Sequence, residues 1–176
     1  TNLDEIADLL ASGKSVAIYQ GRSEAGPRAL GNRSILFDPR DPKAKEKINQ
    51  IKKRENFRPF AGVVMAEHAD KYFDMRSLKE SPFMMYAVNV LSDEVPGITH
   101  VDNTCRIQTV TRKQNEKLYD LIERFYKKTG VPILFNTSFN LAGECIVETP
   151  EDAIRTFENS EIDCLFFAEY LMALGI

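Results

Sequence analysis

The stretch NEKLYDLIERFYKKTGVPILFNTSFN, residues 115–140, decides the fold of this chain. Its first half repeats apolar residues at the i, i+3, i+4 and i+7 positions of one helix face: Leu118, Leu121, Ile122 and Phe125. Two lysines in the last turn and the glycine at position 130 are typical of a helix C-terminus. The following VPILF segment is a short apolar run that predicts a buried strand. A helix that leads directly into a buried strand predicts helices packed on a sheet.

Outside this stretch, helical and strand patterns alternate along the chain. Short apolar runs predict strands at residues 15–20, 34–38, 60–65, 84–91, 106–110 and 164–168. Apolar periodicity and end signals predict helices at residues 2–14, 41–55, 67–73 and 149–159. Asn2 and Glu5 have capping-box spacing, and Thr149 followed by Pro150 marks a helix start. We therefore predict an α/β domain, or α+β by another convention, in which helices flank an open, twisted, mixed sheet.

Length, composition and charge narrow the class of protein. The chain has 176 residues, 43% of them hydrophobic, which suits one compact domain over residues 1–176. Its net charge of −3 argues against a general nucleic-acid binder or a membrane-surface protein. The three cysteines lack CxxC spacing, which makes a disulfide framework or a zinc knuckle improbable and favours a reducing cytoplasm. Because the chain starts at Thr1 without a methionine, we expect a fragment of a longer protein.

The segment GRSEAGPRALGNRS, residues 21–34, concentrates three arginines and three glycines in a slightly acidic protein. It matches neither the Walker A pattern nor the dinucleotide fingerprint. Backbone N–H groups of a glycine-rich turn and the forked guanidinium of Arg28 can nevertheless bind phosphate or carboxylate. The alternative is a plain surface role, in which these arginines pair with acidic neighbours: Glu24, Asp38 and Asp41.

Three further segments add candidate anion-binding residues. IKKRENFRPFAG, residues 51–62, supplies Lys52 and Arg58, and the latter stands between aromatic residues and a rigid proline. THVDNTCRIQTV, residues 99–110, supplies Arg106. His100 and Asp102 in the same segment lack a matching second histidine or nucleophile, so we expect them to have a structural, hydrogen-bonding role.

Neutral polar residues follow the strongest predicted strand. Asn136 and Ser138 lie in LFNTSFNLAGE, residues 134–144, at the edge where α/β sheets commonly hold ligands. Ser138 is not in a G-x-S-x-G elbow, so it is either a phosphate contact or a plain turn serine. Metal-ligand spacing is absent from the sequence, and a divalent ion would arrive as Mg²⁺ carried by a polyphosphate.

Four segments, which occur in the same order, resemble the C-terminal domain of the O-carbamoyltransferase family of antibiotic and nodulation-factor biosynthesis. They are QGRSEAGPRALGNRSILFDPR, IKKRENFRPFAG, THVDNTCRIQTV and TGVPILFNTSFNLAGECIVETPEDAI. The resemblance covers nearly the whole chain, and four ordered motifs make it specific. Three places depart mildly from the family pattern, and none includes an arginine considered above: residues 23–25, residue 62 and residues 103–105.

The resemblance implies a YrdC-like fold that binds ATP and carbamoyl phosphate and forms carbamoyl-adenylate with release of pyrophosphate. It also implies a separate N-terminal Kae1-like domain, absent from this chain, that carries a metal site and passes the carbamoyl group to an acceptor hydroxyl. The implied cofactors are ATP and Mg²⁺ carried by its phosphates. On this basis the phosphates and carbamoyl phosphate are assigned to charged residues, with two neutral donors nearby: Arg28, Lys52, Arg58 and Arg106, then Asn136 and Ser138.

Two other functions stay open at this point. YrdC-like surfaces also occur in proteins that act on tRNA, although the net charge of −3 weighs against a nucleic-acid binding module. A degenerate domain could instead bind ATP for regulation or assembly without catalysing a reaction.

Overall fold

The structure is a computed structural model that describes residues 3–167 and 170–173. Its strands form a single eight-stranded sheet. The strands are β1 (Val16–Tyr19), β2 (Arg33–Phe37), β3 (Ala61–Met65), β4 (Ala87–Asn89), β5 (Thr104–Val110), β6 (Ile133–Ser138), β7 (Cys164–Phe167) and β8 (Tyr170–Ala173). The α-helices are α1 (Leu3–Ala11), α2 (Ala44–Ile51), α3 (Ala69–Tyr72), α4 (Glu116–Thr129) and α5 (Pro150–Glu158), and a 3₁₀ turn, η1 (Ala66–His68), precedes α3.

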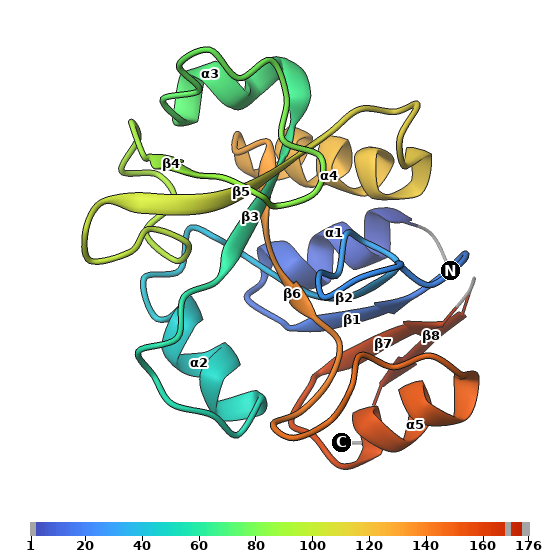
Figure 1. Cartoon of the computed structure of the whole chain (residues 1–176). Coiled ribbons are helices and arrows are strands. Elements are labelled where there is room, and N and C mark those ends of the chain that lie inside the picture. Colours follow the sequence, from blue (N-terminus) through green and yellow to red (C-terminus); the bar gives the residue numbers. More distant parts are fainter. Residues whose placement is uncertain (1–2, 168–169, 174–176) are drawn as a thin grey trace.

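The sheet is mixed, as predicted. Its strand order is β4-β5-β3-β6-β2-β1-β7-β8, with β3 parallel to β5 and β1 parallel to β7. The other neighbouring pairs are antiparallel. Strand β6 lies between β3 and β2, so it alone joins the β4-β5-β3 half of the sheet to the β2-β1-β7-β8 half. Figure 1 shows β6 running through the middle of the fold and ending between α2 and α5.

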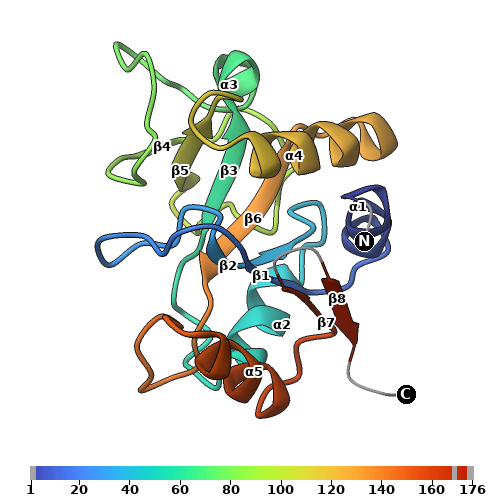
Figure 2. The same cartoon turned by 90° about the vertical axis from the view of Figure 1, so that its right-hand side faces the viewer.

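The predicted helix in residues 115–130 forms as α4, and its apolar stripe is buried. The Asn115 side chain caps its first turn by accepting from the backbone N–H of Leu118, and Gly130 ends it in the left-handed conformation. Helix α1 packs against α4, and Figure 2 shows the two lying side by side. Together they bury apolar side chains from both helices in one core with the central strands.

The start of α5 also follows its sequence signals. The Thr149 hydroxyl accepts from the backbone N–H of Asp152, and the Asp152 carboxylate accepts from the backbone N–H of Thr149, which completes a capping box. The capping role predicted for Asn2 lies outside the described residues. Among the described residues, no helix is long and apolar enough to cross a membrane.

One strand prediction differs from the structure, and one strand was not predicted. Residues 84–91 read as a buried strand, but β4 is only three residues long, and Met85, Tyr86 and Leu91 are exposed. The reason is its place at the edge of the sheet, where it has one partner strand and one uncovered side. Strand β8 was not predicted, and it pairs antiparallel with β7. The strand predicted at residues 164–168 forms as β7, and its last predicted residue, Ala168, lies outside the described residues.

The three cysteines are free and differ in accessibility. Burial raises the pKa of the Cys105 thiol to about 12 and also raises the pKa of Cys164, whereas Cys145 is exposed. Because the thiolate is the reactive form, we expect only Cys145, the exposed one of the three thiols, to react quickly with a disulfide reagent at pH 8. Ellman titration of native protein measures this, and all three should react in denaturant. Fast modification of Cys105 in folded protein would contradict its placement in the core.

Candidate functional site

The end of α2 directs two basic side chains toward the end of β6. The helix stops at Ile51, Lys52 is its C-cap, and Lys53 has a φ of 53°, in the left-handed region. A non-glycine residue rarely adopts this conformation, and here it reverses the chain directly after the helix. The turn places Lys52 and Arg54 on the wall of the same pocket.

Lys52 is almost fully buried and holds the loop that follows β6. Its Nζ donates to the backbone oxygen of Ser138 at 2.6 Å, and to the backbone oxygen and Oδ1 of Asn140 at 2.9 and 2.8 Å. Its own backbone oxygen accepts from the N–H of Ala142 at 3.0 Å. Burial, with a smaller effect of Arg54, lowers the pKa of Lys52 to about 7. The three N–H donors of the ammonium group are therefore used by protein oxygens. Lys52 fixes the loop after β6 and has no donor left for a ligand.

A pocket of about 600 Å³ opens beside this contact. One wall comes from the end of α2 and the turn after it, and the other from the loop after β6: Asn49, Gln50, Lys52, Lys53, Arg54, Glu55, Arg58, Ser138, Asn140, Leu141, Ala142 and Gly143. We call it the large pocket. The predicted residues Lys52, Arg58 and Ser138 thus meet in one cavity, although 86 residues separate Lys52 from Ser138 along the chain.

Arg54 is the residue that sequence reasoning did not assign to the site. Its guanidinium lies over the Phe60 ring, 4.4 Å from the centroid, and its Nε donates to Oδ1 of Asn49 at 2.7 Å. Burial and the neighbouring Arg58 lower the pKa of Arg54 to about 10. The aromatic support expected for Arg58 goes to Arg54 instead, because the side chain of Arg58 is 53% exposed and pairs with Glu55. The sequence did contain a signal, since Arg54 lies between Lys52 and Arg58, the two assigned residues of that segment.

A second pocket of about 80 Å³ adjoins the first, and Arg54 and Ser138 line both. We call it the small pocket. Its other walls come from residues 21–34, which we call the glycine-arginine loop, from β3, β5 and β6, and from the segments before β3 and β4: Pro27, Arg28, Ala29, Pro59, Phe60, Ala61, Met84, Arg106, Asn136 and Thr137. The structure therefore divides the predicted residues between two adjoining pockets, with Arg28, Arg106 and Asn136 in the smaller one.

Arg28 and Arg106 have no hydrogen bond or ion pair from their guanidinium groups within residues 3–167. Arg106 is half-buried, and its Nε is closed to solvent without a partner. Burial lowers the pKa of Arg106, and the positive charge of Arg28 lowers it further. Two guanidinium groups that repel each other without a neutralising carboxylate are the arrangement expected of an anion-binding site.

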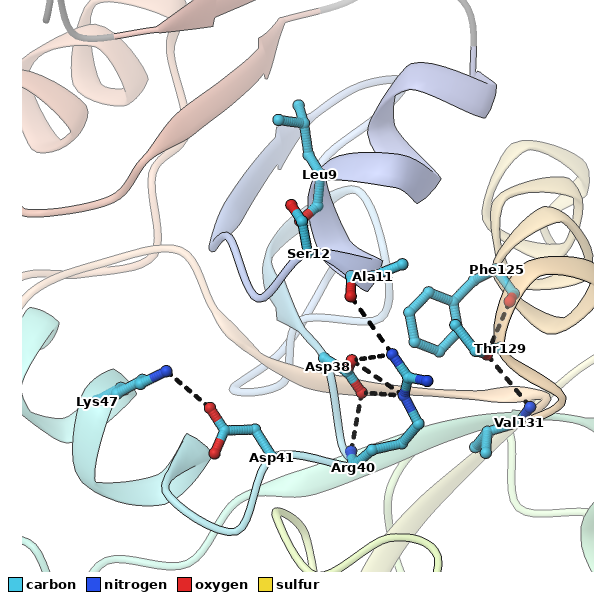
Figure 3. A network of polar contacts seen from close by, with 10 residues as sticks. All are labelled: Leu9, Ala11, Ser12, Asp38, Arg40, Asp41, Lys47, Phe125, Thr129 and Val131. Atoms are coloured by element: carbon cyan, nitrogen blue, oxygen red, sulfur yellow. Dashed lines mark hydrogen bonds and ion pairs between the residues drawn. The ribbon is translucent and has the colours of Figure 1, made fainter.

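The acidic neighbours considered as partners of the loop arginines are occupied elsewhere. Figure 3 shows Asp38 paired with Arg40 and Asp41 paired with Lys47. Oε1 of Glu24 accepts from the backbone N–H groups of Leu30 and Asn32. The surface-pairing alternative is therefore wrong for the described residues.

Arg33 has a structural role. It is 3% exposed, and its guanidinium donates to the backbone oxygens of Gln20 and Asn32 and lies over the Tyr19 ring. It therefore holds the base of the glycine-arginine loop.

His100 and Asp102 have the structural roles that we expected. Nε2 of His100 lies 3.1 Å from the backbone oxygen of Phe60, and Oδ1 of Asp102 accepts from the backbone N–H and hydroxyl of Thr104. Hydrogen bonds from Thr104 lower the pKa of Asp102. These contacts fix the entry to β5 and thereby the position of Arg106.

Comparison with known proteins identifies the family. The model described as carbamoyltransferase C-terminus matches residues 7–173. The chain belongs to the carbamoyltransferase C-terminus family. Nodulation protein NolNO of Sinorhizobium fredii is 47% identical over 171 residues, which are 94% of this chain and 25% of that protein. The 3'-hydroxymethylcephem-O-carbamoyltransferase of Amycolatopsis lactamdurans is 39% identical over 160 residues, 90% of this chain and 30% of that enzyme.

Solved structures show that this carbamoyltransferase C-terminus has the YrdC-like fold. Full-length HypF, solved in a phosphate- and nucleotide-bound form, has a TM-score of 0.68 at 18% identity, covering 98% of this chain and 25% of HypF. Sua5 of P. abyssi, complexed with L-threonine, has a TM-score of 0.67 at 17% identity, covering 94% of this chain and 46% of Sua5. The chain spans about a quarter to a third of the length of the curated relatives named above.

Proposed function

We propose that this chain binds ATP and carbamoyl phosphate in the two connected pockets and forms carbamoyl-adenylate with release of pyrophosphate. A separate N-terminal Kae1-like domain of the same enzyme then passes the carbamoyl group to an acceptor hydroxyl. The observation that carries the proposal is the pair of unpartnered guanidinium groups, Arg28 and Arg106, beside a pocket lined by Arg54 and Arg58. Membership of the carbamoyltransferase C-terminus family supports the same reaction class.

The reaction brings two anions together. Water first splits carbamoyl phosphate into carbamate and inorganic phosphate. A carbamate oxygen then bonds to the α-phosphorus of ATP, the bond between that phosphorus and the bridging oxygen to the β-phosphate breaks, and pyrophosphate leaves with the electron pair. Carbamate and triphosphate repel each other, so catalysis consists mainly of positioning and charge neutralisation. Guanidinium groups suit this task because they stay protonated near neutral pH.

The charged residues of the two pockets receive roles that follow from their positions. Arg54 and Arg58 bind phosphate oxygens in the large pocket, where Ser138 is an additional neutral donor. Arg28 and Arg106 neutralise the reacting end of the ligand in the small pocket. Lys52 orders the Ser138–Asn140 loop. Because its own donors are already used, it acts on the ligand only through its positive charge. HypF, which shares the fold, was solved with phosphate and nucleotide bound.

The residues of the large pocket suit a ligand that brings its own magnesium ion. Within residues 3–167, no group of three His, Cys, Asp or Glu side chains could hold a metal ion. The pocket instead offers guanidinium and amide groups that bind phosphate oxygens. Mg²⁺ keeps several waters and binds through phosphate oxygens in many nucleotide sites, so it would enter with ATP. The ion would neutralise charge on the phosphates.

The location of the protein in the cytoplasm stays a prediction.

The proposal predicts that the chain catalyses exchange of radiolabelled pyrophosphate into ATP only when carbamoyl phosphate and Mg²⁺ are present. Exchange measures the reverse of adenylate formation and needs no acceptor. Acetyl phosphate in place of carbamoyl phosphate is the control. ATP binding without exchange would contradict the catalytic role and favour a regulatory ATP-binding domain. Binding of RNA that weakens steeply with salt, without binding of ATP, would favour the nucleic-acid module.

A further inference from the structure

Gln108 is a buried amide that joins three elements around the small pocket. It lies on β5, two residues after Arg106, so both side chains leave the same face of the sheet. It is 3% exposed, its Nε2 donates to the backbone oxygen of Leu30 at 3.0 Å, and its Oε1 accepts from Nδ2 of Asn136 at 2.9 Å. One side chain thus connects β5, β6 and the glycine-arginine loop, although it lines neither the large nor the small pocket.

The two backbone oxygens directly after Arg28 are held by amide side chains. The oxygen of Ala29 accepts from Nδ2 of Asn136 at 3.3 Å, and the next one along the chain accepts from Gln108. Among the described residues, no other side chain outside the loop forms a hydrogen bond with residues 25–30. The position of Arg28 relative to the sheet therefore depends on these two amides, which are also hydrogen-bonded to each other.

The glycine-arginine loop carries a charge that β5 repels. Arg28 is exposed, and its guanidinium has no hydrogen bond or ion pair within residues 3–167. Its positive charge lowers the pKa of Arg106, so the two guanidinium groups that line the small pocket repel each other. Without an anion between them, this repulsion drives the loop away from β5. The hydrogen bonds of Gln108 and Asn136 to the loop oppose that movement.

We propose that Gln108 is a positioning residue, which holds Arg28 beside Arg106 before the ligand binds. The inference rests on the proposed function, in which both arginines neutralise the reacting end of the ligand. Charged groups stabilise a transition state best when they already lie in place, because no free energy is then spent on moving them during the reaction. Gln108 acts through the loop and through Asn136, and it does not contact ATP or carbamoyl phosphate.

Gln108→Met tests this role, because methionine has a similar length and cannot donate a hydrogen bond to the loop. In the carbamoyl-phosphate-dependent exchange assay we expect kcat to fall by roughly 10- to 100-fold, the size of effect that a small misplacement of reacting groups has. The KM for ATP should change by less than about 2-fold, because the large pocket keeps all its residues. A general loss of stability would not separate kcat from KM in this way.

Limited proteolysis with trypsin reports on the loop itself. The peptide bond after Arg28 should be cleaved at least about 5-fold faster in Gln108→Met than in the wild type, because the loop opens locally more often. The bond after Arg76, whose side chain is 73% exposed and lines neither pocket, should be cleaved at an unchanged rate. Comparing the two bonds in the same chain separates release of the loop from general unfolding.

Two further variants serve as controls. Ser15→Ala removes a fully buried hydroxyl that is hydrogen-bonded to Asp163 and lines neither pocket, so it should lower stability without changing kcat or cleavage of the loop. Gln108→Glu has a similar size and can still accept from Asn136, but when ionised it cannot donate to Leu30. It should show the same faster cleavage after Arg28, and it replaces Gln108→Met if that variant does not fold.

The outcomes separate this inference from the proposed function. Wild-type kcat or unchanged loop cleavage in Gln108→Met overturns the inference and leaves the proposed function standing. An equal fall of kcat in Ser15→Ala also overturns it, because lost stability would then explain both results. If neither Gln108 variant folds, the role of Gln108 is structural and the inference is wrong. If the wild type itself shows no exchange, the proposed function fails and the inference fails with it.

Discussion

Replacing Arg106 with alanine should lower carbamoyl-phosphate-dependent ATP–pyrophosphate exchange by roughly 100- to 1,000-fold, the usual effect of removing one preorganised donor to developing charge. The guanidinium lies half-buried in the small pocket without an internal partner, so its charge is available to a ligand. For the same reason its loss leaves no other protein group unpaired. We therefore expect the thermal unfolding midpoint to stay at or above that of the wild type.

Two further variants sharpen this experiment. Arg106→Lys keeps a positive charge but loses the planar fork and Nε, and it should have intermediate activity. Arg76→Ala removes an arginine whose side chain is 73% exposed and lines neither pocket, and it should retain wild-type exchange. Full exchange in Arg106→Ala would remove this residue from the site, and a lowered unfolding midpoint would show that its role is structural.

Replacing Lys52 with methionine should destabilise the fold and disorder the loop at the end of β6. Methionine has a similar length but cannot donate hydrogen bonds. The backbone oxygen of Asn140 would lose the Lys52 donor, and that of Ser138 would keep only the N–H of Asn140. Each buried hydrogen bond contributes about 1 kcal/mol to stability, and three bonds from Lys52 are lost, so we expect the free energy of unfolding at pH 9 to fall by roughly 2–4 kcal/mol. Urea unfolding measures this loss. ATP affinity should fall as well, because Lys52 fixes the loop that forms one wall of the large pocket.

The destabilisation should depend on pH in a defined direction. Burial lowers the pKa of Lys52 to about 7 in the folded chain, whereas an unfolded lysine titrates near 10.4. Between these values the unfolded state binds more protons, so the stability contributed by Lys52 rises with pH and is lost as the pH falls through 7. The difference between wild type and Lys52→Met should therefore grow from pH 6 to pH 9, by at most about 1.4 kcal/mol per pH unit.

Lys53→Met is the matched control for stability. Lys53 lies next to Lys52, but its side chain is exposed and makes one hydrogen bond, to the backbone oxygen of Asn159 at 3.2 Å. Its replacement should change the free energy of unfolding by less than about 0.5 kcal/mol at either pH. A pH-independent difference between wild type and Lys52→Met would show that Lys52 has an ordinary pKa in the folded protein.

Much of the fold could be predicted from local sequence signals. The apolar stripe of α4, its asparagine cap and its terminal glycine are all encoded within a few residues of one another, as is the capping box of α5. The edge position of β4 is not local, because it depends on which strands lie beside it, and an apolar run does not specify its neighbours. The strand order, with β6 in the centre, likewise depends on long-range pairing.

The candidate site shows the same division. Residue type and motif order located the arginines and the polar end of β6, and the structure brings them to two adjoining pockets. Sequence did not reveal the direction in which individual polar groups point. It did not show that the Lys52 ammonium is used internally, that Phe60 supports Arg54, or that Nδ2 of Asn136 already donates to Gln108 and to the backbone oxygen of Ala29. These outcomes depend on hydrogen-bond partners that are distant in sequence.

The central position of β6 also governs when binding competence arises as the chain folds. The pockets need the turn after α2 from one part of the chain and the end of β6 from another, and the contact between them spans 86 residues. Neither half of the sheet contains a complete site, because β6, the strand that joins the two halves, carries part of the site at its end. Closing such a long loop is slow compared with forming local helices, so ligand affinity is acquired late, together with the union of the two halves.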